Sequence, residues 1–332
     1  MMKIKIFLLF IFCISSSISF SDEVTFDEWL VSFKNDALDQ GISNNTLETV
    51  LSNAEYLPNV IKYDRYQPEF YEDTKTYVTK RTSNKKLKNG ITLYLKNKEV
   101  INNIEIKFNV EKELLLALMG IETNFGKYLG KMDIISSLAT LSFDKRRSAF
   151  FTNELITILK LIDNNIIDYQ TLYGSWAGAF GNFQFMPTTI KQYALDYDNN
   201  NQINLKSIED SFASAANYIS SIGWKNENPC FIKVNLNQNV PIKYLNTSAK
   251  KISFKKKFKF FKKYIDNPET INIDENLYAA IVTPDKDIVP DSEILKPAFI
   301  VFNNYELILK WNRSLRFALA VCTLKNNFKN EL

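Results

Sequence analysis

The chain contains no histidine among its 332 residues. This absence excludes Ser-His-Asp and Cys-His nucleophilic catalysis, and every metal site that is built on imidazole. Carboxylates, lysine or tyrosine must therefore carry any general acid–base chemistry. A strong positive charge is missing as well, because the formal net charge is +4, which does not indicate nucleic acid as a partner. Beyond the N-terminus, no apolar run is long enough to cross a membrane, so we expect no transmembrane anchor in the mature chain.

The N-terminus has the features of a secretory signal peptide. Lys3 and Lys5 form a short positive region, and the apolar run over residues 6–14 is too short to span a bilayer. Small residues at Ser19 and Ser21 predict cleavage after Ser21. Residues 1–21 are therefore expected to be removed on export to the periplasm.

Three cysteines bear on this expectation. Phe12 precedes Cys13 where a lipidation site would need a small residue, so a lipoprotein is disfavoured. After cleavage Cys230 and Cys322 remain. In an oxidising compartment they could pair, or they could be two separate buried thiols. The sequence alone leaves both readings open.

Hydrophobic periodicity predicts a mainly helical chain. Asn89-Gly90 indicates a turn before one helix, and Asn109 can cap the next helix. The last hundred residues are more mixed, with prolines between short strand-like runs at 279–282 and 298–302. The fold class expected is mainly α, with a small α/β part at the C-terminal end. The predicted helices cover residues 25–39, 46–54, 91–108, 147–162, 186–195, 208–221 and 315–324.

Glu122 is the first candidate catalytic residue. It ends a helix whose residues 114–119 and 121 are all apolar, and a helix that is apolar on every side is buried. Gly120 and Gly126 leave space beside it. A carboxyl group in apolar surroundings keeps its proton more easily, as a general acid near neutral pH must. A lone glutamate is more often a surface residue, and the apolar helix is the reason to prefer the functional reading.

The segment from Gly174 to Pro187 is the second candidate. Its small residues let the backbone approach a ligand closely, and Ser175 and Gln184 add a hydroxyl and an amide. The alternative is a tightly packed junction between a loop and a helix. Four rings could offer faces to sugars, namely Trp176, Phe180, Phe183 and Phe185.

Residues 196–210 resemble the first half of an EF-hand calcium loop. Oxygen side chains recur at positions 1, 3 and 5, and position 7 would supply a backbone carbonyl. Asn201 replaces the usual glycine and tolerates the left-handed conformation required there. Ser207 is a poor ligand at position 12, so a later acidic residue would have to close the shell. The alternative is a polar turn. The predicted ligands are Asp196, Asp198, Asn200, Gln202 and Asp210.

Residues 250–264 combine eight lysines with a phenylalanine stripe. Phe254, Phe258 and Phe261 share one helical face, which favours a solvated lysine surface over a core-facing stripe. The alternative is an electrostatic patch for an anionic cell-wall polymer or lipid head groups.

Several motifs together resemble the membrane-bound lytic transglycosylase B family of bacterial cell-wall enzymes. The motif Gly-Ile-Glu-Thr-x-x-Gly is followed by Leu138–Phe143 with Arg146-Arg147, and then by Gly-Ser-x-Ala-Gly-Ala-x-Gly-x-x-Gln-Phe-Met-Pro. Further similar segments lie at 63–70, 217–218, 223–224 and 305–321. The resemblance covers most of the mature chain in the same order.

The resemblance implies a lysozyme-like helical core over residues 22–228 around a peptidoglycan cleft, and a mixed part over 229–332 whose segment 305–324 returns to that cleft. It implies that Glu122 is the single acid/base, that calcium binds the loop closed by Asp210, and that catalysis needs no cofactor. Phe150, Trp311 and Phe317 stand where tyrosines are expected. Residues expected at the substrate are Ser175, Gln184, Phe185, Tyr218, Arg146, Arg147, Trp311 and Asn312.

The implied activity is lytic cleavage of peptidoglycan glycan strands with 1,6-anhydromuramoyl products. A hydrolytic muramidase would need a second carboxylate, for which Asp133 or Glu154 could fold nearby. A peptidoglycan-binding scaffold that does not cut, or a calcium-dependent partner-binding module, are the non-enzymatic alternatives. The sequence leaves open whether the protein works within a larger cell-wall protein complex.

Overall fold

The computed structural model describes residues 24–66, 72–286 and 293–332, so the predicted signal peptide and Cys13 lie outside the described residues. The fold is mainly α-helical with a small sheet, as the sequence predicts. The helices are α1 (Phe26–Asp39), α2 (Asn44–Leu51), α3 (Pro58–Arg65), α4 (Thr74–Arg81), α5 (Asn84–Lys96), α6 (Lys98–Phe108), α7 (Lys112–Thr123), α8 (Ile134–Phe143), α9 (Ser148–Asp163), α10 (Pro187–Tyr193), α11 (Ile208–Ser221), α12 (Phe258–Phe261), α13 (Asn303–Trp311) and α14 (Leu315–Lys329). The strands are β1 (Met132–Asp133), β2 (Tyr173–Gly174), β3 (Phe231–Val234), β4 (Leu245–Asn246), β5 (Lys256–Lys257), β6 (Tyr278–Val282) and β7 (Ala298–Phe302).

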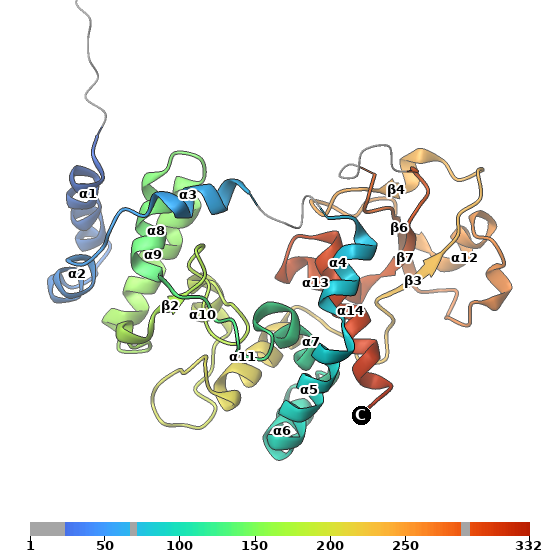
Figure 1. Cartoon of the computed structure of the whole chain (residues 1–332), viewed down its shortest axis with the longest axis horizontal. Helices are drawn as coiled ribbons and strands as arrows, with labels where there is room; N and C mark the ends of the chain where they lie inside the picture. Colours follow the sequence, from blue (N-terminus) through green and yellow to red (C-terminus); the bar gives the residue numbers. More distant parts are fainter. Residues whose placement is uncertain (1–23, 67–71, 287–292) are drawn as a thin grey trace, which may run out of the picture.

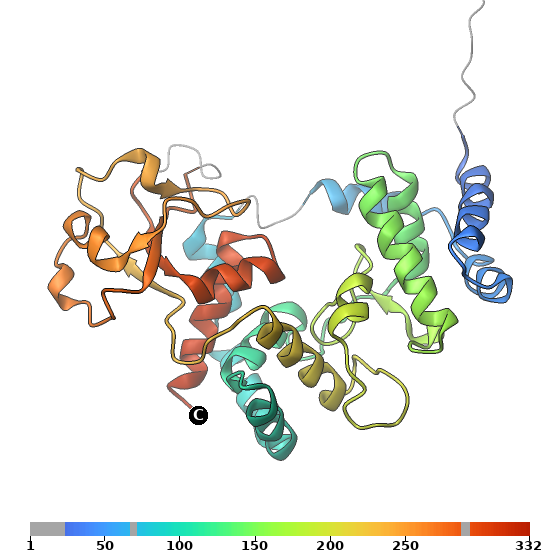
Figure 2. The same cartoon turned by 180° about the vertical axis from the view of Figure 1, so that it is seen from behind.

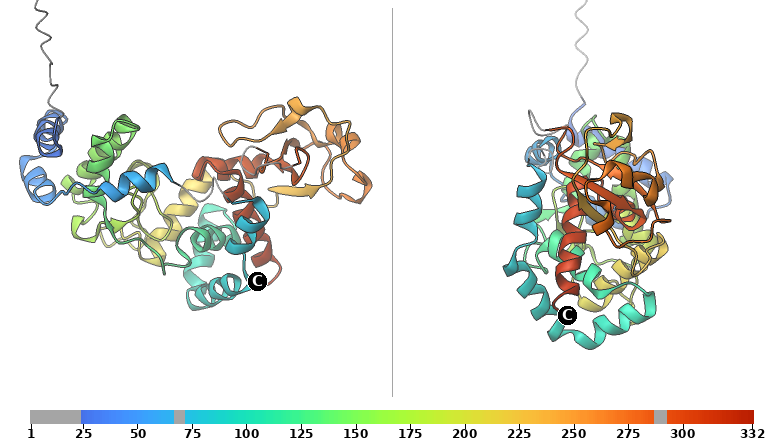
Figure 3. Two further views of the ribbon diagram at one scale, coloured as in Figure 1. Left: turned by 45° about the horizontal axis from the view of Figure 1, so that its top comes forward. Right: turned by 90° about the vertical axis from the view of Figure 1, so that its right-hand side faces the viewer.

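The elements follow one another along the long axis of the molecule. Figure 1 shows α1, α2, α8 and α9 at one end, the sheet and α12 at the other, and α7 and α11 between them. The view from behind keeps this order (Figure 2). The C-terminal helix α14 returns to pack against α7 and α4, and the end-on view shows it beside the helices of the middle part (Figure 3). None of the helices in the described ranges combines the length and apolar composition of a membrane span.

Helix α7 forms the centre of the helical core. Residues Leu114 to Gly120 are all buried, which confirms the prediction made from its unbroken apolar composition. Helices α14 and α5 both pack against it. A helix buried on this many sides can present a polar group only at its end, and Glu122 lies in its last turn.

The sheet is covered on both faces. Its order is β3-β7-β6-β4, with β5 paired to β6, and β6 and β7 are antiparallel. Val282 and Val301 belong to the large helical core, whereas Ile281 and Ile300 belong to a second, smaller core with Phe258. Because neighbouring strand residues point to opposite faces, this alternation buries both faces of the sheet. The two strand-like runs at 279–282 and 298–302 are confirmed as β6 and β7.

The two cysteines of the mature chain form a disulfide. Cys230 precedes β3 and Cys322 lies in α14, and both are buried in the large core. The bond ties the mixed C-terminal part to the helix that packs on α7. The sequence leaves open whether these cysteines pair or stay separate thiols, and in the structure they are paired.

The predicted turn at Asn89-Gly90 is wrong. Helix α5 runs through both residues, and the break comes at Asn97. A Cβ atom on Gly90 would lie 2.3 Å from the ring of Phe328 and 2.8 Å from that of Phe125. The glycine is therefore explained by a close approach of rings from other parts of the chain and not by a turn.

Three other local predictions need correction. Asn109 ends α6 in the left-handed conformation, with φ 52°, and Glu111 is the residue that precedes α7. The lysine-rich segment forms β5, α12 and a short 3-10 turn in place of one helix. Its core-facing rings are confirmed at Phe258 and Phe261, which are fully buried. No separate helix was predicted for α3, α4, α8 or α13. Helices α3, α4 and α13 have only eight or nine residues, and α8 is buried along almost its whole length.

Candidate active site

Glu122 is held at the point where α7 stops. Asn124 and Phe125 follow with φ values of 50° and 61°, which turn the chain away from the helix axis. The Thr123 hydroxyl donates to the carbonyl of Asn182 over 2.8 Å and accepts from the amide of Gly126 over 3.1 Å. These bonds join the end of α7 to the glycine-rich segment, so the motifs around Glu122 and Gln184 meet in space.

A pocket of about 350 Å³ opens beside Glu122, and we call it the Glu122 pocket. Among the described residues that line it, Glu122 is the only carboxylate. The others are three lysines, two asparagines, a serine, an isoleucine and a tyrosine, so the pocket side of the carboxylate is polar and positively charged and not apolar as the sequence predicts. They are Lys80, Lys85, Lys86, Asn89, Asn124, Ser83, Ile121 and Tyr128.

Trp311 donates a hydrogen bond to Glu122. Its indole nitrogen lies 2.9 Å from Oε1 of the carboxylate. The indole stacks on Tyr218 with ring centroids 5.1 Å apart, and Tyr218 stacks on Tyr193 at 4.5 Å. Phe185 meets the indole edge-on at 5.3 Å. The stack fixes the plane of the indole and therefore the direction of its N–H.

Tyr218 is a structural part of this stack. Its hydroxyl donates to the backbone carbonyl of Lys310 over 3.1 Å. Burial, followed by the neighbouring Tyr193, raises the pKa of Tyr218 to about 12, so the phenol stays protonated at neutral pH. Because Lys310 precedes Trp311, this bond also anchors the end of α13.

The expectation that four rings of the glycine-rich segment offer faces to sugars is not met for its three phenylalanines. Phe180, Phe183 and Phe185 are each 3% exposed. Phe183 packs edge-on against Phe212 and Trp311. Phe183 and Phe185 therefore support the indole of Trp311. The alternative of a tightly packed junction between a loop and a helix therefore describes these rings better.

Ser175 and Gln184 shape the loops around this junction. The Ser175 hydroxyl accepts from the amides of Ala177 and Ala179. Gln184 has φ 50°, and its side-chain amide donates to the carbonyls of Gly181 over 3.0 Å and Leu129 over 3.3 Å. Both residues are partly exposed. Gln184 connects the glycine-rich segment to the chain that follows Glu122, whereas the bonds of the Ser175 hydroxyl stay within that segment.

Arg146 and Arg147 are tied to one buried carboxylate. Both guanidinium groups form ion pairs with Asp64, whose side chain is 1% exposed, while their own side chains remain 45% and 41% exposed. Phe150 lies near Arg147 and is exposed. Asn312 follows α13 and is partly exposed. None of these four residues lines the Glu122 pocket in the described part of the chain.

The two carboxylates considered for a hydrolytic mechanism have other partners. Asp133 caps α8 by accepting from the amide of Ser136 over 2.6 Å. Glu154 is buried in α9 and accepts from the amide and the hydroxyl of Thr188 over 2.9 and 2.7 Å. Burial raises the pKa of Glu154. Neither side chain reaches the Glu122 pocket.

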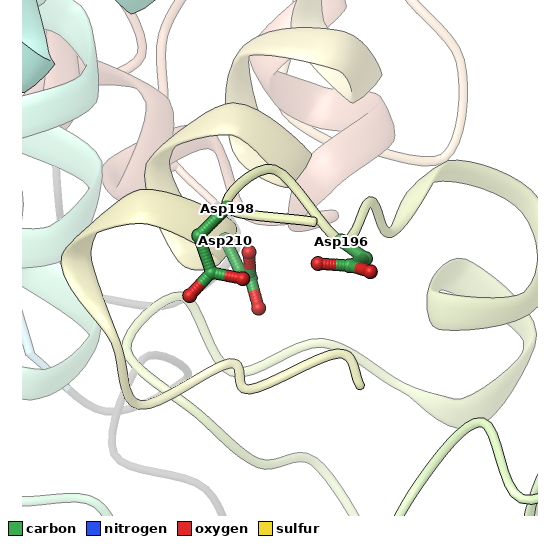
Figure 4. Close-up of side chains that lie close together, drawn as sticks. All are labelled: Asp196, Asp198 and Asp210. Carbon is green, nitrogen blue, oxygen red and sulfur yellow. The ribbon is translucent and has the colours of Figure 1, made fainter. Parts of the chain in front are cut away.

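The acidic loop brings three of the five predicted metal ligands together. Ligand oxygens of Asp196, Asp198 and Asp210 all lie within 4.8 Å of one another. Figure 4 shows the three carboxyl groups turned toward each other, with Asp210 coming from the first turn of α11. Asn201 has φ 70°, so the left-handed conformation expected at this position is confirmed.

The donor set fits a hard divalent cation. Calcium prefers carboxylate and carbonyl oxygens, and within the described ranges none of the three carboxylates forms an ion pair with lysine or arginine. Asp196 accepts from the amides of Asn200 and Asn201, which shapes the loop around it. Asn200 points its amide nitrogen at Asp198, over 2.9 Å, and Gln202 donates its backbone amide to Asn200.

Sequence reasoning missed the lysines of the Glu122 pocket. Lys85 and Lys86 lie in the first turn of α5, about thirty-five positions before Glu122. Their only signal was a pair of charges on a helix that was itself predicted to begin later. The family resemblance places Trp311 at the substrate, where a tyrosine is expected, but it does not indicate the hydrogen bond from Trp311 to Glu122.

A known protein family matches almost the whole chain. A family model described as "Transglycosylase SLT domain" matches residues 25–326. The membrane-bound lytic murein transglycosylase B of Escherichia coli (strain K12) is 32% identical over 194 residues, which is 55% of this chain and 54% of that protein. The match therefore spans about half the length of that curated relative.

Solved structures share the fold. A crystal structure of SltB3 from Pseudomonas aeruginosa in complex with NAG-NAM-pentapeptide has a TM-score of 0.82 and 28% identity, over 92% of this chain and 80% of that chain. The Escherichia coli lytic transglycosylase Slt35 in complex with calcium has a TM-score of 0.75 and 24% identity, over 91% of this chain and 93% of that chain. The second likeness is one of fold alone.

Proposed function

The chain belongs to the Transglycosylase SLT domain family, and we propose that it is a lytic murein transglycosylase with Glu122 as its single acid/base. The substrate would be the β-1,4 bond between N-acetylmuramic acid and N-acetylglucosamine in peptidoglycan that carries its stem peptides. A related structure was solved with NAG-NAM-pentapeptide, which supports this substrate class.

In the proposed reaction, protonated Glu122 donates its proton to the glycosidic oxygen as the bond from that oxygen to the muramoyl anomeric carbon breaks. The muramoyl sugar then carries oxocarbenium-like charge, which its own acetamido carbonyl can stabilise. The ionised Glu122 takes the proton from the muramoyl C6 hydroxyl, whose oxygen bonds to the anomeric carbon. The product is a 1,6-anhydro sugar, Glu122 regains its proton, and no water is consumed.

One observation carries this proposal. Glu122 is the only carboxylate among the described residues of its pocket, and hydrolases of this kind normally use two. The two other candidates, Asp133 and Glu154, are engaged in capping α8 and in holding Thr188. A single group that gives and then recovers one proton is consistent with this arrangement.

The test is release of soluble muropeptides from purified sacculi by the wild-type protein and by Glu122→Gln. Glutamine keeps the shape and can still accept from Trp311, but it cannot donate and recover a proton. We expect at least a thousandfold loss of rate, on the order of the cost of removing an essential acid/base group. Glu113→Gln, on the same helix, is the matched control. Retained release by Glu122→Gln would reject the assignment, and murein binding without any release by the wild type would indicate a scaffold.

We also propose that the acidic loop holds a structural calcium ion. Asp196, Asp198 and Asp210 would supply carboxylate oxygens, with Asn200 and the backbone carbonyl of Gln202 as the remaining protein ligands. The ion would offset the mutual repulsion of the three carboxylates and fix the loop against α11. It would take no part in the bond cleavage.

Export to the periplasm through a signal peptide over residues 1–21 is the proposed localisation. The disulfide between Cys230 and Cys322 supports it, because such bonds persist in oxidising compartments. Fractionation of cells that express the full chain, with a mass measurement of the mature N-terminus, tests both parts of this proposal. A cytoplasmic protein that still begins at Met1 would contradict it.

A further inference from the structure

The Glu122 pocket carries more positive charge than a neutral polysaccharide needs. Lys80, at the end of α4, and Lys85 and Lys86, in the first turn of α5, line it beside one carboxylate. Lys80 is paired with Glu72 over 2.6 Å. Within the described ranges Lys85 and Lys86 form no ion pair, so two positive charges remain for whatever enters the pocket.

Lys86 is the more unusual of the two. Its ammonium group is half-buried and donates a hydrogen bond to the backbone carbonyl of Gly120, two residues before Glu122. Burial, and then the positive charge of Arg81, lower the pKa of Lys86. An ammonium that has lost part of its water and has no anionic partner gains strongly from a carboxylate that reaches it.

The substrate offers such a carboxylate in only one part. The hydroxyl and acetamido groups of the glycan are uncharged, and the lactyl group of a peptide-bearing muramoyl residue is used up in an amide. The remaining carboxylates belong to the peptide. A pentapeptide extends about 17 Å, so a peptide on the muramoyl residue at Glu122 can reach a pocket that Glu122 itself lines.

We infer that Lys85 and Lys86 bind a carboxylate of the stem peptide and make the Glu122 pocket a peptide-recognition subsite. The inference rests on the proposed function, since it takes the muramoyl residue to lie at Glu122. Lys86 supplies a charge that is held on the Gly120 carbonyl, and Lys85 supplies an exposed charge. Peptidoglycan that bears free stem carboxylates is then the preferred substrate over strands whose peptides are removed or amidated.

The test is calorimetric binding of NAG-anhNAM-pentapeptide, a product-like probe that is not turned over. It is compared with the same compound after conversion of its peptide carboxylates to amides, and with NAG-anhNAM that has no peptide. In the wild type we expect amidation to weaken binding about tenfold. In Lys85→Gln/Lys86→Gln the two peptide forms should bind about equally. Glutamine at position 86 can still donate to the Gly120 carbonyl, so a melting curve should show a folded variant.

Lys88→Gln is the matched control, because Lys88 is exposed on the same helix and does not line the pocket. It should keep the full tenfold preference. Equal binding of free and amidated peptide to the wild type would overturn the inference, as would a preference that survives the double substitution. If binding of the peptide-free sugar depends on the two lysines to the same extent, the pocket binds the lactyl carboxylate. That result would also overturn the inference. Failure of the proposed function has a different signature, namely no anhydro product from any murein.

Discussion

The indole nitrogen of Trp311 donates a 2.9 Å hydrogen bond to Oε1 of Glu122, across 189 positions of sequence. The bond explains how the chain tolerates tryptophan where the family resemblance implies tyrosine. The ring that replaces the phenol brings its own N–H, and the stack with Tyr218 and Tyr193 holds it in place. The C-terminal segment thereby takes part in the site through α13.

The first prediction concerns this bond. Trp311→Phe keeps a ring in the stack and removes the donor. A hydrogen bond to a charged group contributes about 2 kcal/mol, so we expect kcat to fall about thirtyfold with KM little changed. Steady-state release of muropeptides measures both constants. Tyr218→Phe removes a hydroxyl of the same stack that bonds to Lys310 and not to Glu122, and it should cost much less. An unchanged kcat in Trp311→Phe would show that the N–H does not position the carboxylate.

A second prediction concerns calcium. Chelation should lower the melting temperature by about 5 °C, because an ion at one hundred times its dissociation constant contributes about 2.7 kcal/mol. Asp198→Asn should lose most of this response to added calcium. Asp274 is an exposed aspartate in the mixed C-terminal part, so Asp274→Asn should keep the full response to calcium. Identical melting curves with calcium and with chelator would leave the acidic loop as a plain polar turn.

Glu154 provides a prediction on pH. Burial raises its pKa above the ordinary 4.5, so the folded state holds the proton more tightly than the unfolded state. Its contribution to stability is complete below pH 4.5 and is lost as the pH rises through the folded pKa. Glu154→Gln, which cannot ionise, should therefore gain stability relative to the wild type as the pH rises. Thermal melts between pH 4 and 8 measure the difference.

Asp163, on the same helix α9, is the control of opposite sign. Hydrogen bonds from the hydroxyls of Ser43 and then Thr46 lower its pKa below 3.8. The stability that the ionised Asp163 contributes to the folded state is present above pH 3.8 and is lost as the pH falls through the pKa of the folded state. Asp163→Asn should be less stable than the wild type at pH 6, with the gap closing below pH 3.8. Parallel curves for the wild type and Glu154→Gln would contradict the Glu154 prediction.

A fourth prediction separates helix propensity from packing at Gly90. Alanine is the better helix former by about 1 kcal/mol, so propensity alone predicts that Gly90→Ala stabilises α5. The clash of the new Cβ with the buried Phe328 predicts the opposite, a loss of about 2 kcal/mol. Denaturant unfolding gives the sign. Lys88→Ala, exposed on the same helix, should change little, and a stabilised Gly90→Ala would refute the close packing.

The sequence predicted those helices and strands whose formation depends on the pattern of neighbouring residues. The unbroken apolar run before Glu122 indicated a buried helix with a carboxylate at its end, and the structure has that helix as α7. The period of residues 208–221 gave α11 with the bounds it has. The two strand-like runs at 279–282 and 298–302, which lie between prolines, correspond to β6 and β7.

What failed depends on contacts between distant segments. Gly90 looks like a turn until Phe328 is placed against it, more than two hundred positions later. The buried phenylalanines of the glycine-rich segment looked like sugar platforms, because composition does not distinguish a ring that lines a pocket from one that supports it. The sequence leaves the pairing of Cys230 with Cys322 open and does not indicate the lysines around Glu122, because both depend on tertiary structure.

The most direct test of the central claim is the fate of water during cleavage. Purified sacculi are digested by the wild-type protein in water enriched in heavy oxygen, and the soluble products are analysed by mass spectrometry. If Glu122 recovers its proton from the muramoyl C6 hydroxyl, every new muramoyl end is a 1,6-anhydro sugar, one water lighter than a reducing end and free of heavy oxygen. Reducing ends that carry heavy oxygen would contradict this account and make the protein a muramidase.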